Sequence, residues 1–297
     1  MEIQEIEQKI KKLEEMKRYA GYDRVVQAKD IIAEMKEDAG KLASGFDALD
    51  NYIDGFHAGQ LVIVSGATGS GKTSFAQTLT HNFMSIGKQC LWFSYEVGMR
   101  EFVRKMPEGI DTFYAPKQIK GNSISWLEQR IIESIAKYGT KIVFVDHLHY
   151  LLEMQKMSEA KSVSLLIGMM LRELKRICIE YDVIIFLLAH LKKIEAYEKP
   201  ELEDLRDSSF VAQESDIVLM IWRHRERNDS QPDGYLYKNN ASVAVRKNRR
   251  TGNLGAFNIE YINNKFKETN DVPAIHRENK SGNYGRDYSA SGDVDGI

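Results

Sequence analysis

The sequence predicts an α/β fold in which helices flank a mainly parallel sheet, together with a short helical arm at the N-terminus. Two observations lead to this fold class. From Leu61 onward, short apolar runs rich in β-branched and aromatic residues alternate with segments of helical periodicity. These runs are almost continuously hydrophobic, which is typical of parallel strands that helices cover on both faces.

Residues 1 to about 40 are expected to form the helical arm. This stretch is highly charged, and its apolar residues recur at helical spacing in two groups that Gly21 separates. The groups are Ile6, Ile10, Leu13 and Met16, and then Val25, Ala28, Ile32 and Met35. Two short helices cannot bury these stripes by themselves, so we expect the arm to pack on the same subunit or on a neighbouring one.

The main domain is expected at residues 41–265. Its parallel strands are predicted at LVIVSG, CLWFSY, KIVFVD, VIIFLLAH and DIVLMIW. After Asp229, the runs SVAVRKNR and AFNIEY flank the turn residues TGN, which predicts an antiparallel hairpin at an edge of the sheet. Residues 266–297 form a C-terminal extension, and we expect disorder from about residue 278 because Gly, Ser, Asn and Asp dominate there.

The composition indicates a soluble protein without a general attraction to polyanions. Lys and Arg total 41 against 43 Asp and Glu in 297 residues, so any nucleic-acid contact must come from local basic patches. Cys90 and Cys178 lie in apolar stretches, where buried reduced thiols are expected, and this favours the cytoplasm. The longest apolar run falls far short of the roughly 20 residues that a membrane helix needs, so no membrane partner is expected.

A glycine-rich segment after the first strand carries the strongest local signal. It reads Gly66-Ala67-Thr68-Gly69-Ser70-Gly71-Lys72-Thr73, with Ser74 next, and it matches G-x-x-x-x-G-K-T between a strand and a helix. The glycines let backbone N–H groups point at phosphates, Lys72 can reach the β- and γ-phosphates, and Thr73 can ligate magnesium. We therefore predict a site for ATP and Mg²⁺.

Two carboxylates follow later strands and are candidates for the same site. Asp146 ends KIVFVD, where a second magnesium ligand is needed, and Glu96 follows CLWFSY at the same carboxyl edge of the sheet. A carboxylate at Glu96 could orient and deprotonate an attacking water. The alternatives are a turn-capping Asp146 and a Glu96 that sits beside a helix N-cap on a solvated loop.

Six segments follow one another along about residues 42 to 262, and they read GATGSGKTS, SYEVG, VFVDHLHYL, LLAHLKK, DLRDSSFVAQESDIVLMIWR and VRKNRRTGNLG. In this order they resemble the motifs of DnaB-type replicative helicases, including phage primase-helicases and the mitochondrial helicase. Residues 204–223 are the most diagnostic. Many ATPases share a phosphate loop, but few share D-L-R-[DE]-S followed by Q-x-[AS]-D and a strand that ends in Arg. The resemblance implies a RecA-like P-loop NTPase fold and an ATP-driven, ring-forming DNA helicase or translocase that moves 5′ to 3′.

The resemblance also implies roles for individual residues. Glu96 is the general base, Asp146 completes the metal site with Thr73, and His190 senses the γ-phosphate at the end of its strand. Lys247 and Arg249 match a basic pair that the family donates into the ATP site of the neighbouring subunit. Without the resemblance, His190 reads as a structural histidine and RKNRR as a solvated basic turn or a nucleic-acid patch.

DNA contacts are expected in two polar loops, at about residues 154–162 and 192–209. Lys192, Lys193 and Arg206 are the candidate phosphate contacts, and Asp207 and Ser209 lie in the same DNA-binding segment. Ser209 stands where the family usually has Gly, so the chain departs from the pattern there. For Lys192 and Lys193, an ordinary charged loop is the alternative.

The partners that the resemblance implies are single-stranded DNA, forked duplex DNA, further copies of the chain in a ring such as a hexamer, and a primase or helicase loader. Two other functions share the nucleotide chemistry. One is a RecA- or RadA-like recombination ATPase, and the other is a replication assembly factor that ATP switches without translocation.

Overall fold

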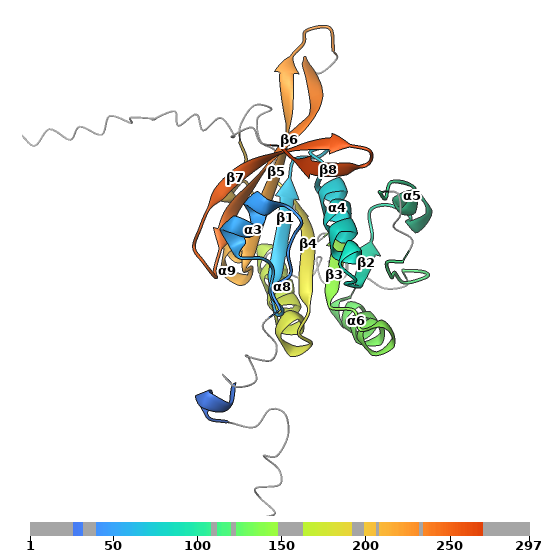
Figure 1. The fold of residues 1–297 in the computed structure, drawn as a ribbon, viewed down its shortest axis with the longest axis vertical. Helices are drawn as coiled ribbons and strands as arrows, with labels where there is room; N and C mark the ends of the chain where they lie inside the picture. The colour runs from blue at the N-terminus through green and yellow to red at the C-terminus, as the bar shows by residue number, and fades with distance from the viewer. Residues whose placement is uncertain are drawn as a thin grey trace, which may run out of the picture.

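A computed structural model describes most of the chain, and its described residues are 26–31, 40–107, 112–119, 123–147, 163–191, 199–205, 208–231 and 234–269. Within them lies one sheet of eight strands in the order β2-β3-β4-β1-β5-β6-β7-β8 (Figure 1). Helices cover both faces of this sheet. The predicted α/β fold class is therefore confirmed.

The five predicted apolar runs form the parallel part of the sheet. They are β1 (Leu61–Gly66), β2 (Cys90–Ser94), β3 (Ile142–Asp146), β4 (Ile184–His190) and β5 (Ile217–Arg227). All five run in the same direction, with β1 between β4 and β5. Because these strands are parallel and joined by crossovers, their carboxyl ends all lie at the same end of the sheet. We call this end of the strands the carboxyl edge and the opposite end the amino edge.

Three antiparallel strands extend the sheet beyond β5. They are β6 (Tyr235–Asn248), β7 (Gly255–Ile262) and β8 (Lys265–Glu268). The predicted hairpin is confirmed as β6 and β7. β5 is longer than DIVLMIW, because it continues to Arg227 and pairs with the first half of β6 in a ribbon that projects from the body (Figure 1).

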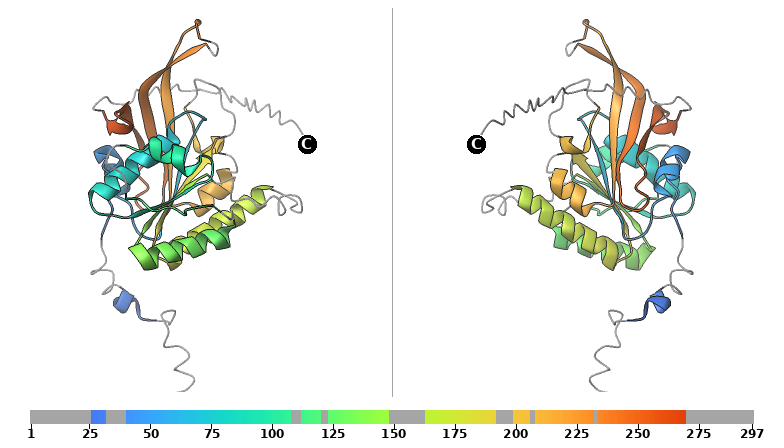
Figure 2. Two further views of the ribbon diagram at one scale, coloured as in Figure 1. Left: turned by 90° about the vertical axis from the view of Figure 1, so that its right-hand side faces the viewer. Right: turned by 90° about the vertical axis from the view of Figure 1, so that its left-hand side faces the viewer.

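The helices form one layer on each face of the sheet (Figure 2). One layer contains α3 (Asp47–Ile53), α4 (Lys72–Ser85) and α5 (Met99–Arg104), and the other contains α6 (Ile124–Tyr138), α8 (Val163–Glu180) and α9 (Ser208–Glu214). A single 3₁₀ turn, η2 (Leu202–Asp204), precedes α9.

An apolar core lies on each face of the sheet, between the strands and one layer of helices. Alternate residues of each parallel strand pack in one core or the other. On β1, Val62 and Val64 pack with the layer of α3 and α4, whereas Leu61 and Ile63 pack with the layer of α6 and α8. Since both faces are buried, the strands need apolar residues at every position, which is why their sequences read as continuous hydrophobic runs.

The predicted arm lies mostly outside the described residues. Residues 28–31 form a helical turn. Val26 before this turn and Ile31 within it are 39% and 47% exposed. The C-terminal stretch expected to be disordered also lies outside the described part. Among the described helices, none has the length and apolar character needed to cross a bilayer.

Candidate nucleotide site

The carboxyl edge gathers the predicted nucleotide-site residues from four neighbouring strands. Ser94 of β2 pairs with Asp146 of β3, and Gly66 of β1 pairs with His190 of β4. Glu96 follows β2 by two residues, so it lies beside the end of β3. The strand order β2-β3-β4-β1 thus brings Glu96, Asp146, His190 and the start of the glycine-rich loop to one place.

The glycine-rich loop, residues 66–73, has a conformation that its glycines make possible. Gly69 and Gly71 have φ values of +77° and +100°, in the left-handed region that other residues avoid. A side chain on Gly66 would meet the carbonyl oxygen of Ile221 at 2.3 Å. The loop therefore needs glycine at Gly66 for space and at Gly69 and Gly71 for backbone geometry.

The rest of the loop surrounds the Lys72 ammonium group. Its Nζ donates to the carbonyls of Gly66 and Ala67, each at 3.0 Å, and its side chain is buried at the first turn of α4. Burial lowers the pKa of Lys72, and the nearby carboxylates of Asp146 and Glu96 oppose that shift.

Residues Ala67, Thr68 and Gly69 are exposed at the tip of the loop. Ser74, the last predicted residue of the segment, lies within α4, where its carbonyl accepts a hydrogen bond from Thr78.

Thr73 and Asp146 contact each other directly. The Thr73 hydroxyl donates to Asp146 Oδ2 at 2.9 Å, and Asp146 is only 2% exposed. Burial raises the pKa of Asp146 to about 6, although the Thr73 hydrogen bond acts in the opposite direction. Two hard oxygen ligands therefore lie side by side next to the loop, as a magnesium ion requires.

Two features of the loop fit a phosphate group. The Ser70 hydroxyl is buried and has no hydrogen-bond partner among the described residues. The N-terminus of α4 starts after Gly71, and no described side chain caps it, so its first N–H groups remain available to an anion. The residues present fit both ATP and Mg²⁺.

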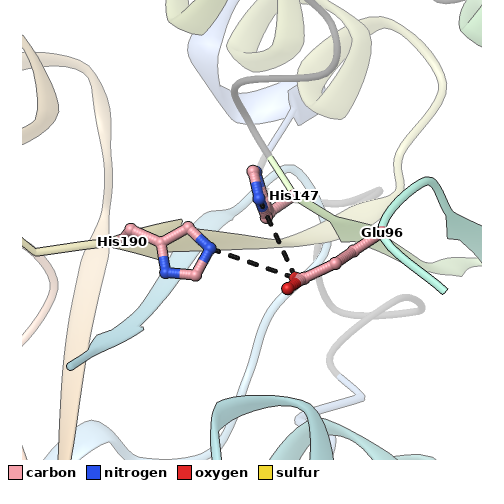
Figure 3. A group of neighbouring side chains, drawn as sticks. All are labelled: Glu96, His147 and His190. Carbon is pink, nitrogen blue, oxygen red and sulfur yellow. Dashed lines mark ion pairs between the residues drawn. The ribbon is translucent and has the colours of Figure 1, made fainter. Parts of the chain in front are cut away.

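Glu96, His147 and His190 form a cluster beside this loop (Figure 3). Glu96 Oε2 lies 3.8 Å from His147 Nε2 and 3.9 Å from His190 Nε2, and the two imidazole rings are perpendicular with centroids 4.3 Å apart. His147 is buried and follows Asp146 through a cis peptide bond. Sequence reasoning missed His147, although its place directly after a strand-ending Asp is a usable signal.

Lys247 and Arg249 do not join the carboxyl edge. Lys247 Nζ donates to the carbonyl of Ser215, and Arg249 donates to the carbonyl of Gln213 at 2.6 Å. Both lie beside Asp216, which precedes β5 and accepts from the backbone N–H of Leu61 at the start of β1. They therefore lie at the amino edge, at the start of β1, whereas the glycine-rich loop of the same chain follows the end of β1.

Most of the predicted DNA-binding residues are not among the described residues. Lys192, Lys193, Arg206 and Asp207 lie outside the described residues, as does the loop at 154–162. Ser209 is described, and it is exposed in the first turn of α9.

Comparisons with known proteins agree on one family. The family model of the DnaB-like helicase C-terminal domain matches residues 41–110 and 115–270. The probable replicative DNA helicase of Trieres chinensis is 25% identical over 282 residues, which cover 80% of this chain and 60% of that protein. The replicative DNA helicase DnaB of Haemophilus influenzae is 23% identical over 281 residues, which cover 82% of this chain and 58% of that protein.

Solved structures show the same fold. The ATPase domain of G40P has a TM-score of 0.65 at 22% identity, with 81% of this chain and 96% of that chain covered. A DnaB-like replicative helicase, described with its interactions with primase, has a TM-score of 0.62 at 21% identity, with 88% and 71% covered. This chain spans about 60% of the length of the curated relatives named above. The match to the family model over most of its residues shows that the chain belongs to the DnaB-like helicase C-terminal domain family.

Proposed function

We propose that this chain is the ATP-hydrolysing motor of a replicative DNA helicase, and that it translocates 5′ to 3′ on single-stranded DNA to separate a forked duplex. One observation carries the proposal, namely the meeting of Lys72, the Thr73–Asp146 pair and Glu96 at the carboxyl edge. Together these groups supply phosphate charge, metal ligands and a base, which phosphoryl transfer to water requires.

Each group has a distinct part in the proposed reaction. The backbone of the loop and Lys72 hold the phosphates of ATP, with Ser70 as a further donor. Thr73 and Asp146 would hold Mg²⁺, which when bound neutralises charge on the β- and γ-phosphates. Glu96, whose side chain is 43% exposed, orients a water and accepts its proton. His190, at the end of β4, hydrogen-bonds the γ-phosphate and couples its presence to the segment that follows.

Lys247 and Arg249 are proposed to act on the ATP of a neighbouring subunit. β1 separates them from their own loop, a distance of roughly 16 Å for six residues of strand. A head-to-tail neighbour could instead present its amino edge to this carboxyl edge, and such an arrangement forms a ring where the rotation between subunits closes. This supports a homo-oligomer such as a hexamer, in which Arg249 stabilises charge on the transferring phosphoryl group.

The remaining parts of the proposal concern DNA and assembly. Lys192, Lys193 and Arg206 contact DNA phosphates, with Asp207 and Ser209 in the same segment. Residues 1–40 serve as the arm that joins subunits, residues 41–265 as the motor and residues 266–297 as an extension. A primase or a helicase loader is the further partner, since a structural neighbour is described with primase.

Turnover of ATP with and without single-stranded DNA, together with unwinding of a forked duplex, tests the proposed function. A helicase motor is expected to hydrolyse ATP faster with the single strand and to separate the fork only with ATP. Strand pairing without unwinding would support a recombination ATPase, and turnover that ignores DNA would support an ATP-switched assembly factor.

Sedimentation of the chain without residues 1–40 tests the arm. We expect a shift towards monomers and a lower DNA-stimulated turnover, with ATP binding by each monomer retained. Val25, Ile32 and Met35 are the proposed contacts with the neighbouring subunit, and all three lie outside the described residues. A truncated chain that sediments like the full chain would show that the arm is not the connector.

A further inference from the structure

Three side chains at the carboxyl edge form a group that the proposed hydrolysis does not fully use. Glu96, His147 and His190 each offer one ligand atom, and these atoms all lie within 4.8 Å of one another. They come from the ends of three neighbouring strands, β2, β3 and β4, so the sheet itself holds them together.

The separations are too long for direct hydrogen bonds and suited to a bridging ion. At 3.8 and 3.9 Å, Glu96 Oε2 is beyond hydrogen-bond reach of either Nε2 atom. Zinc bonds to nitrogen and oxygen are about 2.0–2.2 Å long, so two ligands of a tetrahedral zinc ion lie about 3.3–3.6 Å apart. Both separations exceed this range by a few tenths of an ångström, so a small movement of the Glu96 side chain brings the carboxylate into place.

The ligand set selects a different ion from the one expected at Thr73 and Asp146. Magnesium prefers oxygen ligands, whereas imidazole suits zinc, copper, iron and nickel. His147 is buried and fixed at the end of β3, while Glu96 is partly exposed on the bend after β2 and can move to close the site. The fourth position stays open for water, as in three-ligand zinc sites.

We propose that Glu96, His147 and His190 bind a zinc-class divalent ion, and that this ion inhibits ATP hydrolysis by holding the Glu96 carboxylate away from the attacking water. The inhibitory half rests on the proposed role of Glu96 as the base, whereas the binding half rests on the three side chains alone. The site is reversible, since a chelator that removes the ion releases Glu96 and restores turnover.

Metal binding is tested first, without nucleotide and with excess Mg²⁺. Co²⁺ added to the tag-free protein is expected to give the visible absorption of a tetrahedral nitrogen and oxygen site. A sulfur-to-cobalt charge-transfer band is not expected, because both cysteines of the chain are buried in the cores. Zn²⁺ should displace one equivalent of Co²⁺ per chain.

Variants locate the site. His147→Ala, His147→Gln and Glu96→Gln should each weaken Zn²⁺ binding at least about 100-fold, since loss of a direct ligand costs more than the 10–100-fold typical of outer-shell partners. His57→Ala is the matched control, because His57 hydrogen-bonds Asp54 away from the cluster and should leave Zn²⁺ affinity unchanged. Thermal melts confirm that each variant is folded. No Zn²⁺ binding by the folded wild type, or equal binding by the His147 variants, would overturn the site.

Inhibition is tested by adding Zn²⁺ during ATP turnover at constant Mg²⁺. Wild type should lose turnover and regain it with a chelator, whereas His147→Ala should show no further loss from its own zinc-free rate. Zinc that binds these residues without slowing turnover would overturn the inhibitory role. The zinc-free rate of Glu96→Gln judges the proposed function separately, so failure of either proposal can be recognised.

Discussion

The two edges of the parallel sheet carry similar charged groups but arrange them differently. At the carboxyl edge, the Lys72 ammonium donates to two backbone carbonyls, and the Glu96 carboxylate lies 3.8 Å or more from its histidine neighbours. At the amino edge, Lys175 pairs with Asp216 at 2.6 Å and Arg249 lies 3.6 Å from the same carboxylate. At the carboxyl edge the ammonium and the Glu96 carboxylate thus stay apart, whereas at the amino edge basic side chains pair with Asp216.

Arg249→Ala, a change at the amino edge, should lower ATP turnover more than any other substitution below. If the amino edge serves an adjacent site, turnover should fall by about 10³–10⁵-fold while each subunit still binds ATP, because an arginine finger contributes that much. Turnover and nucleotide affinity are measured side by side. Arg250→Ala is the control, since Arg250 is the next residue and only approaches Asp54 at 3.6 Å.

Mixing variants sharpens the same prediction. Combining Arg249→Ala with Lys72→Ala protein should restore some turnover, because a mixed interface can hold one intact carboxyl edge and one intact amino edge. An Arg249→Ala chain with wild-type turnover would show that the amino edge has no part in the reaction.

Glu96→Gln should have the next largest effect, confined to the carboxyl edge. Removal of a general base slows turnover by about 10²–10⁴-fold, while ATP binding should persist because Lys72 and the loop remain. Glu101→Gln, in the exposed first turn of α5, should leave turnover unchanged. Wild-type turnover in Glu96→Gln would exclude Glu96 as the base.

Neutralising Lys192, Lys193 and Arg206 together should alter DNA binding but not ATP affinity. Each lost phosphate contact lowers the log-log salt slope by about 0.7, so the three changes should reduce it by about 2. Single-stranded DNA affinity is measured over a series of salt concentrations. Alanine at the exposed Lys41, Lys105 and Lys137 is the matched control for net charge. An unchanged slope would move the DNA contacts elsewhere.

The smallest expected effect is a pH dependence of stability at the amino edge. Burial lowers the pKa of Lys247 from 10.5 to about 8. Between these values the unfolded chain binds more protons than the folded chain, so the free energy of unfolding rises with pH from about 8 to about 10.5. The rise should be about 1 kcal/mol, because solvent screens a half-buried group.

Urea unfolding at several pH values measures this rise. Lys247→Met should abolish it, and Met at the exposed Lys267 should not. Equal slopes for Lys247→Met and wild type would show that Lys247 is not the titrating group.

The parallel strands and the nucleotide loop could be predicted because local sequence determines them. Strands buried on both faces must be continuously apolar, and a loop around phosphate needs its glycines. The extension of β5 to Arg227 carried no such signal, because an exposed ribbon alternates charged residues such as Arg223 and Arg225 and owes its order to pairing with β6. β8 was missed because KFKE is short and has one buried apolar residue, Phe266.

The shared position of three site residues could also be predicted from the sequence, because the ends of parallel strands determine it. Glu96, Asp146 and His190 each end or follow a parallel strand, so they had to share an edge. His147 directly follows the strand-ending Asp146, so the same rule places it at this edge, but its approach to Glu96 depends on side-chain direction rather than on spacing.

β8 adds a consequence for how the chain matures during synthesis. Phe266 reaches back to the nucleotide loop, where its ring lies 3.0 Å from the position of a Cβ on Gly71, and its backbone N–H donates to the Thr78 hydroxyl across 188 residues of sequence. Chains leave the ribosome from the N-terminus at about 5–20 residues per second. Residues 66–73 are synthesised early, whereas Phe266, which packs against them, is synthesised only after nearly the whole described domain. A nascent chain therefore acquires its complete phosphate-binding loop only when synthesis has passed β8.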